Sequence, residues 1–218
     1  MSNSTVKKAT RRNVGQKQSI ARAIARTLDS YSDEQIMAEL LQNADDAGAT
    51  RAAFLIDERR HSSQKVYKGG RMEELQGPAL VAFNDEIFKE EHFNGLLSFG
   101  RGSKKLDPTK TGKFGLGFNS VYHVTEAPSF STGDWWVILD PQRRYFPGLG
   151  SGSEPGMMIQ PRTEEDKASL RDLYSAYEYS CFGAANPLEK YVKGTVFRFP
   201  LRTPKQARDS ILRKNTPF

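Results

Sequence analysis

Apolar side chains recur at helical spacing in two segments near the start of the chain. In residues 19–29 they fall at positions i, i+4 and i+8, which is typical of one buried helix face. The next helix is predicted to begin after Ser32, because Ser32 and Gln35 form a capping-box pattern, and to end at Gly48, a common residue at helix C-termini. Its buried stripe is predicted to contain Ile36, Met37, Leu40, Leu41, Ala44 and Ala47.

Shorter apolar segments, bounded by glycine, proline and polar residues, predict β-strands. The strands are expected at residues 52–57, 79–83, 129–131, 135–140 and 195–201. Further helices are expected at residues 90–99, 115–124, 163–177 and 204–213, and glycine-rich loops at residues 100–113 and 149–156. This order of elements predicts an α+β fold: a two-layer sandwich in which helices cover one face of a mixed, mostly antiparallel sheet.

The charge of the chain is concentrated at one end. The 218 residues carry a formal net charge of +6, and residues 1–30 account for all of it, so the rest of the chain is neutral overall. We expect residues 1–17 to form a basic, disordered tail and residues 18–218 to form one domain. A neutral domain argues against nucleic acid as a partner.

The composition excludes several classes of protein. No apolar segment approaches the roughly 18–20 residues that a membrane span needs. The single cysteine, Cys181, and three histidines without metal-ligand spacing argue against a disulfide-rich module and a zinc enzyme. These features favour a cytoplasmic protein, and the basic, acid-poor start of the chain leaves a mitochondrial location as the alternative.

Three polar residues share one face of the helix predicted between Ser32 and Gly48. Glu39, Asn43 and Asp46 are spaced i, i+4 and i+7, next to the apolar stripe. A carboxylate one turn from a carboxamide suits a group that activates water beside a neutral oxygen ligand for Mg²⁺. The alternative interpretation is a solvated polar face.

A glycine-rich segment precedes the helix predicted at residues 115–124. The backbone N–H groups of Gly112, Gly115 and Gly117 are able to surround an anion at the start of that helix. Basic residues stand just upstream, at Arg101, Lys104 and Lys105. Together they favour a phosphate site over a simple tight turn, which is the alternative.

Two polar residues stand at strand ends. Asp85 follows the strand predicted at residues 79–83, and Thr195 opens the strand predicted at residues 195–201. A carboxylate in such a place is able to accept a hydrogen bond from the exocyclic amine of adenine. The alternatives are a turn-forming acid at Asp85 and a plain β-turn before Thr195.

These segments occur in an order that resembles the ATP sites of the superfamily of gyrase, heat-shock chaperones, histidine kinases and MutL. More narrowly, LLQNADDAGAT, GPALVAFND, GKFGLGFNSVYHVTEAPSF and GTVFRFPLR resemble sacsin-type repeat domains, over about residues 20–213. The resemblance implies a Bergerat-type fold that binds ATP or ADP with Mg²⁺, in a weakly ATP-hydrolysing, nucleotide-gated chaperone. It also implies protein clients or co-chaperones, and a place in a longer multi-repeat chain.

The resemblance implies roles for single residues as well. Glu39 matches the general base that orients the attacking water, Asn43 matches the Mg²⁺ ligand, and Asp46 matches the next helix residue of the site. Asp85 matches the acid that recognises the adenine amine, and Thr195 matches the threonine that joins this acid around a water. The residues that match the phosphate site are Arg101, Lys104, Gly112, Lys113, Phe114, Gly115, Gly117 and Phe118.

One segment departs from the superfamily pattern. Glycines usually follow the adenine-recognising acid, whereas here Asp85 is followed by Glu86, Ile87 and Phe88, as in the sacsin-type repeats. The alternative function is therefore a chaperone-like protein-interaction module that keeps the fold but has little or no nucleotide affinity. A histidine kinase is disfavoured, because none of the histidines lies on a predicted dimerising helix pair. The neutral domain argues against a DNA-repair or topoisomerase ATPase.

Overall fold

The structure, a computed structural model, describes residues 19–29, 32–89, 92–93, 117–149, 155–179 and 191–215. In chain order its elements, with η for a 3₁₀ helix, are α1 (Ile20–Leu28), η1 (Asp33–Gln35), α2 (Ile36–Asp46), β1 (Ala52–Asp57), η2 (Met72–Leu75), β2 (Ala79–Asn84), η3 (Gly117–His123), β3 (Ser129–Gly133), β4 (Trp135–Leu139), β5 (Gly156–Ile159), α4 (Glu164–Ser169), α5 (Arg171–Ser175), β6 (Val192–Pro200) and α6 (Pro204–Asp209). No helix within these residues is long and apolar enough to cross a membrane.

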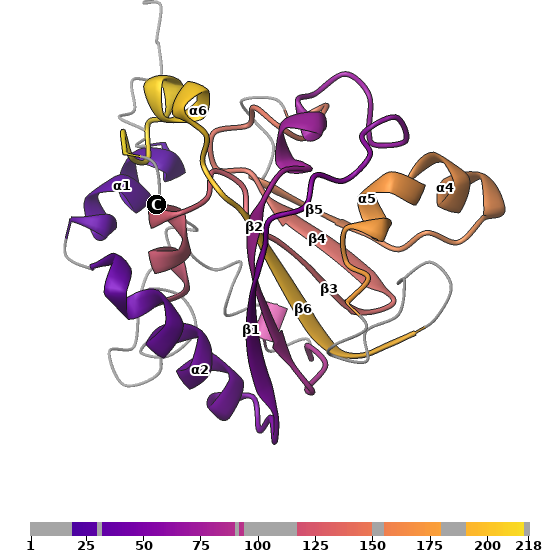
Figure 1. The fold of residues 1–218 in the computed structure, drawn as a ribbon, viewed down its shortest axis with the longest axis horizontal. Helices are drawn as coiled ribbons and strands as arrows, with labels where there is room; N and C mark the ends of the chain where they lie inside the picture. Colours follow the sequence, from indigo (N-terminus) through magenta and orange to yellow (C-terminus); the bar gives the residue numbers. More distant parts are fainter. Residues whose placement is uncertain are drawn as a thin grey trace, which may run out of the picture.

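The six strands form one sheet in the order β1-β2-β6-β3-β4-β5, and every neighbouring pair is antiparallel. The longest strand, β6, lies between β2 and β3, near the middle of the sheet (Figure 1). Its register places Thr195 opposite Asn84, the last residue of β2. The predicted α+β class is thus confirmed, and the sheet is antiparallel throughout.

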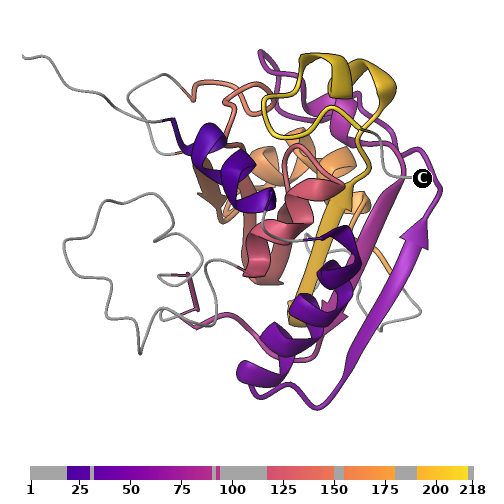
Figure 2. The same cartoon turned by 90° about the vertical axis from the view of Figure 1, so that its left-hand side faces the viewer.

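Helices α1, α2 and η3 cover one face of the sheet (Figure 2). Their apolar residues, among them Ile24, Leu40 and Phe118, form a core with Phe197 and Phe199 of β6. The 3₁₀ helix η1, which leads directly into α2, begins after Ser32, whose N–H donates to Gln35 Oε1 at 3.2 Å, as the capping-box pattern predicted. The helix α2 ends before Gly48, which adopts a φ of +84° that suits glycine.

The opposite face carries a second core, built around Trp136 of β4. Met72 of η2, together with Leu173 and Tyr174 of α5, packs there, on the far side of the sheet from α2 in Figure 1. Alternate residues of β4 therefore belong to different cores, one on each face of the sheet. The prediction of a single helix-covered face did not include this second core.

Several local predictions differ from the structure, among them the helix expected at residues 204–213, which ends at Asp209. The helix expected at residues 163–177 is divided at Leu170, which leaves helical geometry with φ −111° and ψ 8° and buries its side chain. The strand β5 was not predicted, because its residues follow a Gly/Ser/Pro segment. On α2, Met37 and Leu41 are 41% and 53% exposed, so the buried stripe is narrower than predicted.

Candidate functional site

The polar face of α2 is directed toward η3 rather than into bulk solvent. Glu39, Asn43 and Asp46 are all half-buried, whereas Leu40 and Ala44 on the neighbouring stripe are fully buried. The i, i+4 and i+7 spacing therefore places the three polar residues in a line along the margin of the core. This arrangement matches the sequence prediction of one shared face.

The carboxylate of Glu39 lies against the backbone at the start of η3. A Cβ built on Gly117 would come within 1.8 Å of Glu39 Oε2. Only a residue without a side chain leaves space for the carboxylate in this position, because real Cβ atoms essentially never approach other atoms so closely. The structure thus brings together Glu39 and Gly117, two residues that the sequence analysis assigned to one site.

Asn43 and Asp46 follow Glu39 along the same face. The Oδ1 atom of Asn43 is buried and has no hydrogen-bond partner among the described residues. Asp46 Oδ1 accepts a hydrogen bond from Gln42 Nε2 at 3.2 Å. A buried carboxamide oxygen without a partner is costly, so Asn43 Oδ1 is a good candidate for a ligand contact.

The far end of η3 is held by a buried ion pair. Arg202 Nε donates to Glu126 Oε1, and the two side chains are 0% and 1% exposed. The same guanidinium donates to the backbone carbonyls of Tyr122 and His123, at 2.6 and 2.7 Å. These bonds satisfy carbonyls at the end of η3 and fix the helix whose other end contacts Glu39. Sequence reasoning missed this pair, whose members are 76 residues apart.

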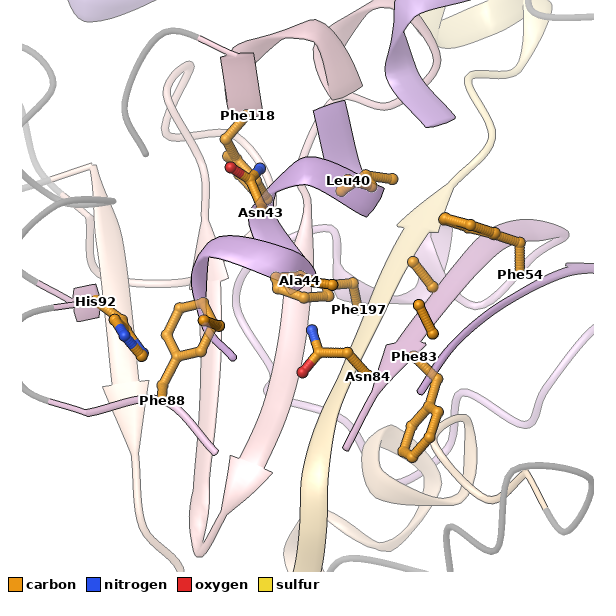
Figure 3. Close-up of a pocket in the computed structure, with 13 residues that line it drawn as sticks. Leu40, Asn43, Ala44, Phe54, Phe83, Asn84, Phe88, His92, Phe118 and Phe197 are labelled. Carbon is orange, nitrogen blue, oxygen red and sulfur yellow. The ribbon is translucent and has the colours of Figure 1, made fainter. Parts of the chain in front are cut away.

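A mainly apolar pocket lies between α2 and the sheet (Figure 3). Leu40 and Ala44 line it from α2, and Phe54, Ala82 and Phe197 line it from the sheet. The polar residues in its lining are Asn43, Asn84 and His92. Its open space is about 20 Å³, which is roughly enough for one water molecule.

Phe88 lines the pocket and packs among other aromatic rings. Its centroid lies 4.9 Å from that of Phe130 and 5.8 Å from that of Phe197, with Phe93 and His92 on its other sides at 5.3 and 5.6 Å. Phe88 therefore belongs to an aromatic cluster at one side of the pocket. The sequence had marked this segment only by its missing glycines.

Asp85 does not line the pocket. Its Oδ1 accepts hydrogen bonds from the N–H groups of Thr50 and Arg51, each at 2.9 Å, and its Oδ2 accepts one from the Thr50 hydroxyl at 2.6 Å. These hydrogen bonds hold the pKa of the Asp85 carboxyl below its ordinary value, and the bond from the Thr50 hydroxyl has the largest effect. In this structure Asp85 joins the end of β2 to the start of β1.

The preceding residue, Asn84, lines the pocket instead. Along β2, Leu80 and Ala82 belong to the core beneath α2, so alternation places Asn84 on the same face. It stands opposite Thr195 in the neighbouring strand. Strand β2 therefore directs the carboxamide of Asn84, and not the carboxylate of Asp85, to the pocket.

Thr195 is fully buried, and its hydroxyl is hydrogen-bonded to the segment after Asp85. Its hydroxyl donates to the carbonyl of Glu86 at 2.7 Å and lies 2.9 Å from the hydroxyl of Thr132. The Thr132 hydroxyl accepts the Phe88 N–H, also at 2.9 Å. The two threonines thus fasten residues 86–88 to the sheet and hold the Phe88 ring at the pocket.

The structure describes only some of the residues that were predicted to form the phosphate site. Gly117 begins η3, and the buried Phe118 lines the pocket beside Asn43 (Figure 3). The predicted residues Arg101, Lys104, Gly112, Lys113, Phe114 and Gly115 lie outside the described residues. Within the described residues there is no group of three or more His, Cys, Asp or Glu side chains that is arranged to hold a metal ion.

Comparison with known proteins places these features in a family. The family model named Sacsin domain matches residues 17–217. Human sacsin is 39% identical over 198 residues, which is 90% of this chain and only 4% of that protein. The chain therefore spans a small part of the length of this relative. Because the family model matches nearly all of the chain, the chain belongs to the Sacsin domain family.

Proposed function

We propose that this domain is a magnesium-dependent nucleotide-binding module of a sacsin-like chaperone, in which bound nucleotide gates contacts with protein clients or co-chaperones. The observation that carries the proposal is the buried Oδ1 of Asn43, which has no hydrogen-bond partner among the described residues. It lies one turn from the carboxylate of Glu39 and lines the pocket between α2 and the sheet. The Bergerat-type nucleotide site implied by the sequence resemblance has this arrangement of polar groups.

The residues present fit Mg²⁺ that arrives with a nucleotide. Mg²⁺ in phosphate-binding sites is commonly held by one or two protein oxygens, together with substrate phosphates and waters. Asn43 Oδ1 would supply a neutral oxygen. When bound, the cation would neutralise charge on the phosphates. The basic and glycine-rich residues 101–117 are the proposed contacts for the phosphates themselves.

Glu39 is the proposed general base of slow ATP hydrolysis. Its carboxylate is held in a half-buried place against Gly117, near the start of η3. A carboxylate fixed in this way is able to orient a water molecule and accept its proton. Phosphoryl transfer depends mainly on positioning and charge stabilisation, so few protein groups are needed.

A second candidate function rests on a different observation. The pocket has room for about one water molecule, and Phe88 lines it. A domain that keeps this arrangement permanently would act through protein contacts alone, with little or no nucleotide affinity. The exposed Met37 and Leu41 on α2 are apolar groups available to such contacts.

Titration calorimetry of the purified chain with ATP, ADP and GTP, with and without Mg²⁺, separates the two candidates. We expect magnesium-dependent binding that Asn43→Leu abolishes. The matched control is Met37→Ala, which changes an exposed residue of the same helix and should leave binding unchanged. Glu39→Ala should keep binding and lose turnover. Absence of heat with all three nucleotides at millimolar concentration would favour the protein-contact module.

A further inference from the structure

The amide of Asn84 has a fixed orientation at the floor of the pocket. Its Oδ1 accepts the backbone N–H of Glu86 at 3.1 Å. An amide that accepts through its oxygen on one side must present its NH₂ group on the other. In Figure 3 the nitrogen end of the Asn84 amide lies on the side of α2, and the oxygen end is turned away. The floor of the pocket therefore presents a hydrogen-bond donor.

The neighbouring hydroxyl groups do not change the donor character of the pocket floor. Thr195 and Thr132 are buried and hydrogen-bonded to each other and to the backbone of residues 86–88. The hydroxyl proton of Thr195 goes to the carbonyl of Glu86, so Thr132 donates to Thr195. The unpartnered acceptor Asn43 Oδ1 belongs to the α2 wall beside Phe118, not to the floor (Figure 3).

We propose that Asn84 makes this pocket select a purine ring that presents a carbonyl group at its edge over one that presents an amine. The proposal rests on the proposed nucleotide-binding function and specifies its ligand. A carbonyl, as in inosine or guanosine triphosphate, accepts a hydrogen bond from the Asn84 NH₂ group. An amine, as in ATP, would set a donor against a donor and leave both unpaired in an apolar place.

The surroundings of Asn84 suit a flat ring. Phe88, Phe130 and Phe197 form an aromatic cluster with centroid separations of 4.9 to 5.8 Å. The Phe88 ring already lies in this cluster, and its side chain is only half-buried. A purine would take a similar place once the Phe88 side chain turns outward, and the main chain at Phe88 would remain held by Thr132.

The test compares magnesium-bound inosine triphosphate with magnesium-bound ATP, which differ in the group at position 6 and the adjoining ring proton. Dissociation constants are measured by calorimetry on the natural chain, on Asn84→Asp and on Asn84→Ala. We expect the natural chain to prefer inosine triphosphate by at least about tenfold, the effect of one unpaired polar group. Asn84→Asp keeps an oxygen for the Glu86 N–H and presents its other oxygen to the pocket, so the preference should reverse.

Asn84→Ala removes the amide that discriminates between the two rings, so the affinities for inosine triphosphate and ATP should become equal within about threefold. This variant provides the test if Asn84→Asp does not fold. Equal or tighter binding of ATP by the natural chain would overturn the proposal while leaving nucleotide binding intact. A preference unchanged by both substitutions would overturn it too. If neither nucleotide binds the natural chain or Phe88→Ala, the proposed function fails, and this inference fails with it.

Discussion

The carboxylate of Glu39 and the α-carbon of Gly117 are in direct contact, with no room between them for a methyl group. A Cβ on Gly117 would lie 1.8 Å from Glu39 Oε2 and 2.7 Å from its carboxyl carbon. The contact joins α2 to the first residue of η3, two segments that are nearly 80 residues apart in sequence. Its effect is to fix the direction of the one carboxylate proposed to act on water.

Gly117→Ala should displace this carboxylate without unfolding the domain. The atoms that clash belong to the end of a flexible side chain, and the backbone at Gly117 has no positive φ, so unfolding free energy should change by about 1 kcal/mol or less. Turnover of nucleotide should fall about as far as in Glu39→Ala, by about a hundredfold. Steady-state phosphate release and urea unfolding measure the two effects.

A double variant and a glycine elsewhere provide the controls for this prediction. Gly117→Ala combined with Glu39→Ala should be no worse than Glu39→Ala alone, because both act through one carboxylate. Gly77→Ala has free space, with Arg60 Nη1 3.9 Å from the added Cβ, and should keep full turnover. Additive losses in the double variant would show that Gly117 does not act through Glu39.

Asp85→Ala should weaken the fold locally and leave nucleotide selectivity unchanged. The substitution removes three hydrogen bonds to Thr50 and Arg51 that join β1 to β2. Because Asp85 does not line the pocket, the ratio of affinities for inosine triphosphate and ATP should match that of the natural chain. Thermal unfolding and calorimetry on the same sample measure both. A changed ratio would restore Asp85 to the base-recognising role that the resemblance implied.

The sequence predicted the α2 face well because one helix carries all of its residues. The spacing of Glu39, Asn43 and Asp46 along α2 is set by helix geometry, whatever packs against it. The distinction between Asn84 and Asp85 depended on which face of β2 meets α2. The alternation of Leu80, Ala82 and Asn84 contains that signal, but it becomes decisive only when the two cores are known.

Contacts between distant segments were beyond prediction from residue patterns. The Glu126–Arg202 pair gives no local signal, since charged residues are usually exposed. Nor does the sequence indicate that Thr132 and Thr195 hold residues 86–88, because this depends on the pairing of β3 with β6. The strand β5 is short, and it pairs with β4 at the edge of the sheet, where local sequence preferences are weak.

Arg202→Met should destabilise the domain by about 3–5 kcal/mol, because it leaves the carboxylate of Glu126 buried without its cation. Backbone carbonyls at the end of η3 also lose their donor, so Arg202→Met/Glu126→Leu should recover only part of the loss. Urea unfolding measures both. The control is Lys167→Met, which breaks an exposed pair with Glu164 and should cost about 0.5 kcal/mol or less. A similar small cost for Arg202→Met would contradict the role given to the pair.

Phe88→Ala should open the pocket at the expense of stability. Loss of a half-buried ring from the aromatic cluster should cost about 2 kcal/mol, less than for a fully buried phenylalanine. Nucleotide affinity should rise by about tenfold, because a bound purine no longer has to displace the ring. Phe146→Ala, in the opposite core, is the matched control and should destabilise the domain without raising affinity. Unchanged affinity in Phe88→Ala would show that the ring does not obstruct the site.

Asp57, the last residue of β1, should make the stability of the domain depend on pH. Burial acts to raise the pKa of its carboxyl, but hydrogen bonds from Arg59, His61 and Tyr179 outweigh burial and hold the pKa well below its ordinary value. A carboxyl whose pKa is lower in the folded state stabilises that state above its unfolded pKa of about 3.9, and this contribution is lost as the pH falls toward the folded pKa.

Asp57→Asn should therefore lower the unfolding free energy by about 2 kcal/mol at pH 7, where the natural chain has a charged acceptor for these three donors. At pH 3 the gap between the two proteins should narrow, because Asp57 of the unfolded natural chain is then largely protonated and folding has to release that proton. Urea unfolding of both proteins at the two pH values gives the difference directly. Asp134→Asn, at the exposed turn between β3 and β4, should change stability by less than about 0.5 kcal/mol at pH 7. A gap that is equal at pH 7 and pH 3 would mean that the hydrogen bonds to Asp57 do not depend on its charge.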